Sequence, residues 1–321
     1  MSGQLRLAIA QARPRWLDRA ATTAQALELM RRAAADGAQA IVFPETFLPG
    51  YPIWVCRTDG ARFDADDQKR AYDAYLEAAV EADGPELREI EALARELGLF
   101  AYLGMAERGC GDARGTVFCS LAAIDPARGA TTVHRKLLPT YDERLVWGRG
   151  DGFGLRAHDV GGARLGGLCC WENWMPQARQ ALYADGTDVL VGVWPGNRSL
   201  TADITRFVAL EGRVWSVAAS ALLDSSDVPE DFPLHAALTA NGPERYFDGG
   251  SAVADPRGAW LVEPLVGEER LIVVDLDLAA ARRERLLFDP TGHYARPDVF
   301  GATVDRRRLR AARFVDEEPA R

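Results

Sequence analysis

Two kinds of hydrophobic pattern, one typical of strands and one typical of helices, alternate along the chain from one end to the other. Short apolar runs, typical of buried β-strands, occupy residues 5–11, 40–43, 100–105, 117–124, 131–134, 165–169, 189–193, 216–223, 251–253, 260–262 and 271–274. Helical periodicity covers residues 19–35, 67–81, 85–97, 176–184, 204–215 and 278–286. Such alternation predicts an α/β architecture in which helices cover the faces of sheets.

The pattern shows no linker or change of composition inside the main body of the chain. A loop rich in Gly and Pro spans residues 138–154, but strands and helices continue on both sides of it. We therefore predict one domain over residues 1–304 and a charged C-terminal tail over residues 305–321. The tail's basic run is followed by Asp316, Glu317 and Glu318, which offset it and disfavour a nucleic-acid-binding arm.

The composition argues against several classes of protein. The 321 residues carry a net charge of −9, whereas a nucleic-acid-binding protein needs a basic surface for its phosphate contacts. No apolar stretch approaches the ~20 residues of a membrane-spanning helix, and the N-terminus lacks the pattern of a secretory signal. The few, scattered cysteines fit neither a disulfide framework nor a structural zinc site; they are Cys56, Cys110, Cys119, Cys169 and Cys170. We expect a reduced, cytoplasmic protein.

The strongest candidate for chemistry is a cysteine between a predicted strand and a predicted helix. Pro176 suits the first turn of that helix, and a thiol at such a junction faces the positive end of the helix dipole, which favours the thiolate. Successive strand residues point to opposite faces, so Cys169 and Cys170 do not both enter one pocket. Cys170, nearer the helix, is the candidate nucleophile. Most free cysteines are buried apolar residues, so this segment alone does not decide.

A carboxylate follows another buried strand, amid prolines and aromatic residues. Glu45 comes directly after Phe43 and Pro44, in a setting where burial is expected to raise its pKa. A carboxyl group with a raised pKa is suited to act as a general base or acid near neutral pH. A helix cap or a solvated loop acid is the alternative interpretation.

The third candidate is a lysine in a chain that otherwise uses arginine. Of 38 basic residues only Lys69 and Lys136 are lysines, and Lys136 directly follows Arg135. A lysine at this position suggests a need for a compact ammonium group rather than a planar guanidinium. A chance lysine on a surface loop is the competing interpretation.

Other catalytic patterns are weaker or absent. The sequence has no GxSxG elbow, GxxxxGK phosphate loop, HExxH zinc motif or GxGxxG after a strand. A couple of Cys170 with His293 is conceivable, although an isolated histidine is more often structural.

Together the three segments resemble the nitrilase branch of the carbon–nitrogen hydrolase superfamily. They occur in that family's order, and the similarity extends over nearly the whole chain except the tail, through residues 43–52, 134–140, 143–152, 170–173, 209–213 and 292–298. Trp174 is a departure, since tyrosine is more usual there.

The resemblance implies a four-layer α-β-β-α sandwich that dimerises, often further into spirals or filaments. It implies Cys170 as nucleophile, Glu45 as general base and acid, Lys136 as electrostatic stabiliser and Glu143 as a second acid that positions the others. His293 and Arg296 are then structural or interface residues.

The implied reaction converts an organic nitrile to its carboxylic acid and ammonia, without metal or organic cofactor. A nitrile carbon is a modest electrophile, and a thiolate is a nucleophile strong enough to attack it. An amidase or carbamoylase with the same Cys–Glu–Lys set, a hydratase that stops at the amide, and an inactive scaffold remain alternatives. Several aromatic residues are candidates for lining the substrate pocket, and burial in the core is the alternative interpretation: Tyr51, Trp54, Trp147, Trp171 and Trp194.

Overall fold

Two β-sheets lie face to face at the centre of the molecule. The computed structural model describes residues 3–128 and 130–312. The first sheet has the order β13-β1-β2-β3-β4-β5. Its strands are β1 (Gln4–Gln11), β2 (Ala40–Val42), β3 (Phe100–Arg108), β4 (Val117–Asp125), β5 (Ala130–Arg135) and β13 (Arg270–Asp277). Strands β1, β2 and β3 are mutually parallel, and β3-β4-β5 form an antiparallel meander.

The second sheet has the order β10-β11-β9-β8-β7-β6, and β12 pairs with β11. Its strands are β6 (Ala157–Val160), β7 (Ala163–Cys169), β8 (Val189–Trp194), β9 (Trp215–Ser220), β10 (Leu222–Asp224), β11 (Arg245–Ala254) and β12 (Trp260–Val266). Strands β7, β8 and β9 are parallel and buried along their length, as expected for strands covered on both faces.

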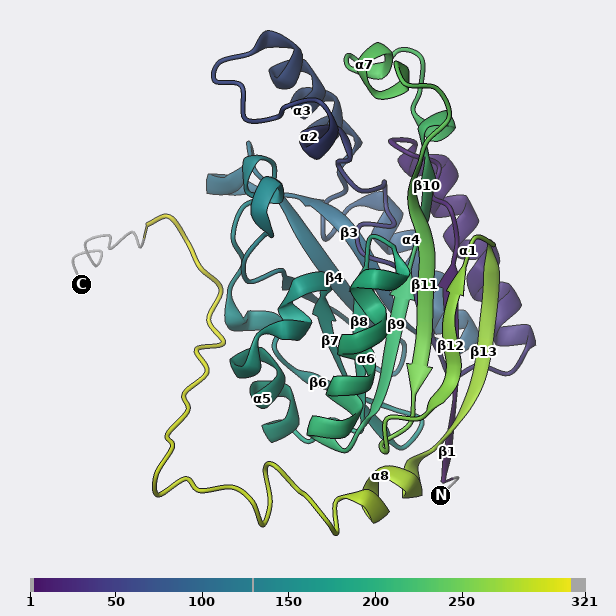
Figure 1. Ribbon diagram of the computed structural model, residues 1–321, viewed down its shortest axis with the longest axis vertical. Coiled ribbons are helices and arrows are strands. Elements are labelled where there is room, and N and C mark those ends of the chain that lie inside the picture. The colour runs from purple at the N-terminus through teal and green to yellow at the C-terminus, as the bar shows by residue number, and fades with distance from the viewer. Residues whose placement is uncertain (1–2, 129, 313–321) are drawn as a thin grey trace, which may run out of the picture.

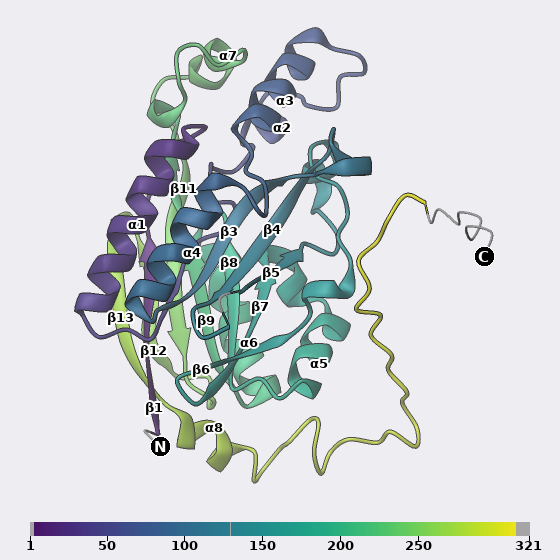
Figure 2. The ribbon, with the colours of Figure 1, turned by 180° about the vertical axis from the view of Figure 1, so that it is seen from behind.

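Helices cover the outer face of each sheet, as Figures 1 and 2 show from opposite sides. Helices α1 (Arg19–Ala35) and α4 (Pro85–Leu97) pack on the first sheet, and α5 (Pro176–Ala184) and α6 (Arg198–Gly212) on the second. The largest apolar core lies between the sheets, with Leu7 and Tyr102 from one side and Val191 and Val217 from the other. The predicted four-layer α-β-β-α sandwich is confirmed.

The sequence patterns located most elements to within a few residues, with one displaced helix. Helix α6 was predicted at residues 204–215 but spans Arg198–Gly212, because its polar first turns carry little amphipathic signal. Arg213, with a left-handed backbone, ends the helix before β9 begins at Trp215. Four further helices complete the fold: α2 (Trp54–Arg57), α3 (Asp66–Ala78), α7 (His235–Thr239) and α8 (Leu278–Glu284). No helix in the described part of the chain is both long and apolar enough to cross a membrane.

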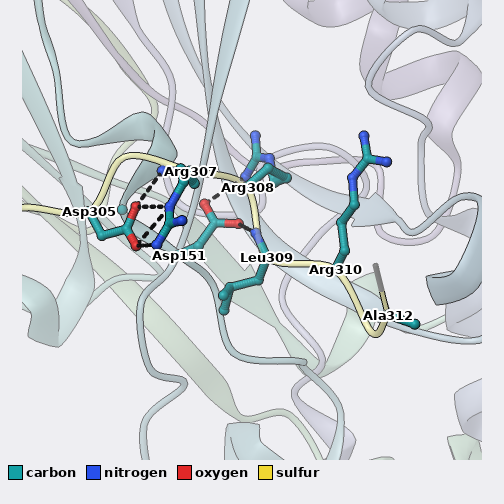
Figure 3. Close-up of a pocket in the computed structure, with 8 residues that line it drawn as sticks. Asp151, Asp305, Arg307, Arg308, Leu309, Arg310 and Ala312 are labelled. Carbon is teal, nitrogen blue, oxygen red and sulfur yellow. Dashed lines mark hydrogen bonds and ion pairs between the residues drawn. The ribbon is translucent and has the colours of Figure 1, made fainter. Parts of the chain in front are cut away.

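Beyond α8, residues 285–312 form what we call the C-terminal strap. It contains turns but no helix or strand and passes outside α5 (Figures 1 and 2). Asp151 holds it near its end: one carboxylate oxygen lies 3.1 Å from Arg308 Nη1, and the other accepts a hydrogen bond from Leu309 N at 2.9 Å (Figure 3). The described part of the predicted charged tail, 305–312, is thus attached to the body; 313–321 lie outside the described residues.

Candidate active site

The three sequence-predicted groups lie just beyond the ends of three strands. Glu45 follows β2, Lys136 directly follows β5, and Cys170 directly follows β7. Strand β5 runs parallel to β2 through the intervening meander, so their carboxyl ends lie at the same edge of the first sheet. The second sheet brings Cys170 to this edge, so that the site forms between the sheets.

Lys136 is fully buried between two carboxylates. Its Nζ donates to Glu45 Oε1 at 3.1 Å and to Glu143 Oε2 at 2.7 Å. Its main chain is fixed as well, since Lys136 N donates to Cys119 O and Gly150 N donates to Lys136 O, both at 2.8 Å. A lysine held in this way cannot be a surface charge.

Glu143 is held by donors on every side. Its Oε2 also accepts from Thr140 N at 2.6 Å, and its Oε1 accepts from the Tyr51 hydroxyl at 3.0 Å. Glu45 differs, because its Oε2 is buried without a hydrogen-bond partner among the described residues. Glu45 therefore has one oxygen available to exchange a proton, whereas Glu143 is committed to its partners.

Cys169, the last residue of β7, and Cys170, the first residue of the turn that follows, face different surroundings, as predicted. Cys169 is buried in the core between the sheets, whereas Cys170 lines a cavity of about 310 Å³. The Cys170 sulfur and carboxylate oxygens of Glu45 and Glu143 all lie within 4.8 Å of one another. Asn173 Nδ2 donates to Cys170 O at 2.8 Å and fixes the turn that carries the thiol.

Left-handed backbone conformations gather at this site. Cys170 (φ 47°), Thr46 (φ 45°), Tyr141 (φ 43°) and Asn197 (φ 83°) all lie beside the reacting groups or in the cavity wall. Each such conformation costs a non-glycine residue about 1–3 kcal/mol and persists only where the surroundings enforce it. The positions of these side chains are therefore maintained at a cost in folding stability.

Burial and neighbouring charges shift the proton affinities of the cluster. Burial, opposed by the Lys136 charge and reinforced by Glu143, raises the pKa of Glu45 to about 8. Burial alone would lower the pKa of Lys136, but the Glu45 and Glu143 carboxylates hold it well above its ordinary value. The site therefore keeps a permanent ammonium beside a carboxyl group that titrates near neutrality.

The expectation that a helix dipole favours the Cys170 thiolate is wrong for this structure. Burial raises the pKa of the Cys170 thiol well above its ordinary value, and Lys136 offsets this only in part. A 3-10 turn, Cys170–Trp174, separates the thiol from the start of α5 at Pro176, so the thiol does not lie in the first turn of that helix, where the dipole acts. The thiol therefore requires a base to take its proton.

Two of the five aromatic residues proposed as substrate contacts line the cavity. These are Tyr51 and the half-exposed Trp171. Trp54 is instead buried in the core, Trp147 packs against Tyr51, and Trp194 lies under the site at the end of β8. The remaining wall comes from residues that the sequence did not single out: Ile53, Cys56, Arg57, Thr140, Tyr141, Asp142, Pro195, Asn197, Leu200, Tyr246 and Phe247.

His293 and Arg296 lie far along the chain on the exposed C-terminal strap. His293 contacts Tyr294, and Arg296 pairs with Asp298 at 2.7 Å in solvent. Neither is among the residues that line the Cys170 cavity, so a Cys170–His293 couple is not formed.

Glu45, Glu143 and Cys170 also offer three metal-type ligands. The Lys136 ammonium, however, lies within hydrogen-bond distance of both carboxylates and supplies the positive charge that they require. The residues fit an acid–base and nucleophile set better than a cation site.

Comparisons with known proteins agree with this geometry. A family model described as carbon-nitrogen hydrolase matches residues 6–285. A nitrilase of Bradyrhizobium diazoefficiens is 35% identical over 297 residues, covering 92% of this chain and 91% of that protein. An aliphatic nitrilase of Sinorhizobium fredii is 34% identical over 308 residues, covering 94% of this chain and 96% of that protein. The solved structure of a carbon-nitrogen hydrolase from Helicobacter pylori shares the fold, with a TM-score of 0.69 at 17% identity, covering 93% of this chain and 97% of that one.

Proposed function

The chain belongs to the carbon–nitrogen hydrolase family, and we propose that it acts as a nitrilase, converting an organic nitrile and two waters to a carboxylic acid and ammonia. One observation carries the proposal: Cys170, Glu45 and Glu143 converge around a buried Lys136, and Cys170 and Glu143 line the adjoining cavity. The chain is a hydrolase acting on carbon–nitrogen bonds.

The first half of the reaction joins the substrate to the enzyme. The Glu45 carboxylate takes the proton of the Cys170 thiol, and the sulfur forms a bond to the nitrile carbon. One C–N π bond breaks as its electron pair moves to nitrogen, which receives the proton from Glu45. The product is a covalent thioimidate, and Glu45 is again a carboxylate.

The second half consumes two waters. Glu45 takes a proton from the first water, whose oxygen adds to the thioimidate carbon, and returns it to nitrogen, which becomes an amino group. Glu45 then moves the proton of the new hydroxyl group to that nitrogen; the C=O double bond forms, the C–N bond breaks and ammonia leaves. The thioester that remains is attacked by the second water in the same way, and sulfur leaves with the proton. The carboxylic acid product is released, and the free Cys170 thiol is regenerated.

Lys136 stabilises the charge that develops on nitrogen during the attack. The backbone N–H of Trp171, which lowers the pKa of the Cys170 thiol by hydrogen bonding to it, is a second donor beside the sulfur. Loss of one such fixed donor costs about 3–4 kcal/mol in comparable sites. Glu143, with its donors occupied, keeps the ammonium in place.

The test is a product assay that separates the neighbouring activities. Purified enzyme is given aliphatic, aryl and arylacetonitriles and the matching amides, and ammonia, acid and amide are quantified. We expect acid and ammonia in equal amounts from at least one nitrile class. Ammonia from amides alone would identify an amidase, and amide as the sole nitrile product would identify a hydratase.

We further propose that the protein works as a homo-oligomer of at least two copies, and that further copies extend the dimer into a spiral or filament. An exposed apolar patch on the Cys170–Trp174 turn and α6 supports this, made of Trp171 (46% exposed), Trp174 (41%), Phe207 (43%) and Leu210 (41%). Trp174 and Phe207 stack there. Contiguous aromatic patches of this kind are typical of protein interfaces.

We also propose a cytoplasmic location, which the five free thiols support because reducing compartments preserve them.

A further inference from the structure

One buried carboxylate near the site has no role in the reaction as written. Glu172 is 1% exposed and belongs to the turn Cys170–Trp174. Its Oε2 accepts from Cys169 N at 2.8 Å, and its Oε1 accepts from Leu137 N at 2.6 Å. One donor directly precedes Cys170 in the chain, and the other directly follows Lys136.

These two hydrogen bonds join the two sheets. Lys136 leaves β5 in the first sheet, and Cys170 leaves β7 in the second. Glu172 thus holds the main chain beside the ammonium and the main chain beside the thiol with the two oxygens of a single rigid carboxylate. A shift of either sheet relative to the other would have to break one of these bonds.

A histidine completes the arrangement. His134 Nε2 lies 3.0 Å from Glu172 Oε2 and 3.2 Å from its Oε1, and His134 Nδ1 has no partner in the described chain. Glu172 therefore faces only donors. Burial favours the neutral acid, but His134 and the two main-chain N–H groups outweigh it and hold the pKa of Glu172 below its ordinary value.

We propose that Glu172, supported by His134, is a positioning residue that fixes the Cys170 thiol relative to the Lys136 ammonium. The proposal rests on the nitrilase function, because it predicts that Glu172 and His134 affect the rate of nitrile hydrolysis. A simple structural role, capping the turn, accounts for the bond from Cys169 N but not for those from Leu137 N and His134.

Glu172→Gln is the direct test. Glutamine keeps the size but has one acceptor oxygen, so its amide N–H₂ must face one of the two main-chain donors. A displacement of about 1 Å in a catalytic group can cost roughly 10²-fold in rate. We expect kcat to fall by about that factor with KM little changed, and alkylation of Cys170 by iodoacetamide, followed on its own peptide, to slow by about tenfold.

The matched control is Glu107→Gln. Glu107 is an equally buried carboxylate bonded to Arg135 and Ser120, with no contact to the cysteine turn. It should lose thermal stability but keep kcat and the Cys170 alkylation rate. Wild-type kcat and alkylation in folded Glu172→Gln, or equal losses in both variants, would overturn the proposal.

A second pair of variants applies if Glu172→Gln does not fold. His134→Gln retains an N–H donor toward Glu172, whereas His134→Leu removes it. The proposal expects the glutamine variant to keep more of kcat and of the alkylation rate, and equal losses contradict it. If the wild-type enzyme hydrolyses no nitrile, the nitrilase function fails, but the alkylation rates still decide the role of Glu172.

Discussion

At the scale of single residues, Lys136 is a clear exception to the chain's preference for arginine over lysine. Only two of its 38 basic residues are lysines, and this one is fully buried between Glu45 and Glu143. In Lys136→Arg the larger, planar guanidinium cannot occupy the site of a compact ammonium. We expect a folded enzyme whose kcat is reduced by at least ~10²-fold in steady-state ammonia assays.

The other lysine provides the control. Lys69 is exposed and pairs with Asp64 on the surface, so Lys69→Arg should be silent. Wild-type rates in both variants would mean that Lys136 is not part of the catalytic set.

The pKa of Glu45 predicts how activity depends on pH. Burial raises that pKa to about 8, and only the carboxylate form can take the Cys170 proton. As pH falls through 8 the carboxylate is lost, so kcat/KM should decline by about tenfold per pH unit below that value. A profile of kcat/KM from pH 5 to 10 measures this acid limb.

Glu45→Gln tests whether the limb belongs to this residue. The amide keeps the shape but cannot transfer the proton, so turnover should fall by at least ~10²-fold, and the residual activity should lack the limb near pH 8. An unchanged profile in the variant would assign the base to another group, with Glu143 the next candidate.

At the scale of elements, the sequence identified the three strand ends that carry chemistry. Periodicity placed β2, β5 and β7 to within a few residues, and it placed Glu45, Lys136 and Cys170 at or just beyond the ends of these strands. What sequence periodicity does not contain is the contact between two sheets. Glu172 was therefore not singled out, because its partners Leu137 and His134 are more than 30 positions away.

The same limit explains the errors. Trp54 sits near Tyr51 in sequence, yet α2 turns it into the core against Tyr75, while Tyr51 remains in the cavity wall. The cavity's Tyr246 and Phe247 come from β11, which no local pattern links to the site. The pKa of the Cys170 thiol does not follow from the local helix position, because burial, a tertiary property, has the largest effect on it.

A close approach between two segments supports the position of Glu45. A Cβ added at Gly104 on β3 would lie 1.9 Å from Pro44 O and 2.8 Å from Glu45 Cα. Gly104→Ala must therefore push away the segment that carries the base. We expect a loss of about 1–3 kcal/mol in stability and a kcat at least ~10-fold lower, measured by thermal unfolding and ammonia release.

Gly115→Ala is the matched control, since a Cβ there meets nothing within 4 Å. It should leave both quantities unchanged. Full activity in Gly104→Ala would show that the Glu45 segment tolerates displacement and that its placement matters less than the geometry implies.

At the scale of the whole molecule, the aromatic patch on α6 predicts association of copies. Light scattering should give a mass of at least twice 35.1 kDa at working concentration. Phe207→Asp places a charge among Trp174 and its neighbours and should lower that mass. The exposed, charge-conserving substitution Lys69→Arg, away from the patch, should not. A fully active wild-type monomer would remove the oligomer from the proposal.

The most direct test is where the nitrile becomes attached. Wild-type enzyme is quenched with acid during turnover of a nitrile that it hydrolyses, and it is then digested. The masses of its cysteine-containing peptides are measured by mass spectrometry. Cys170→Ala and Cys169→Ala are treated in the same way. We predict an adduct on Cys170, no adduct and no ammonia from Cys170→Ala, and substantial turnover by Cys169→Ala, because Cys169 faces the core between the sheets. Ammonia release by folded Cys170→Ala at the wild-type rate, or an adduct on another cysteine, would contradict Cys170 as the nucleophile.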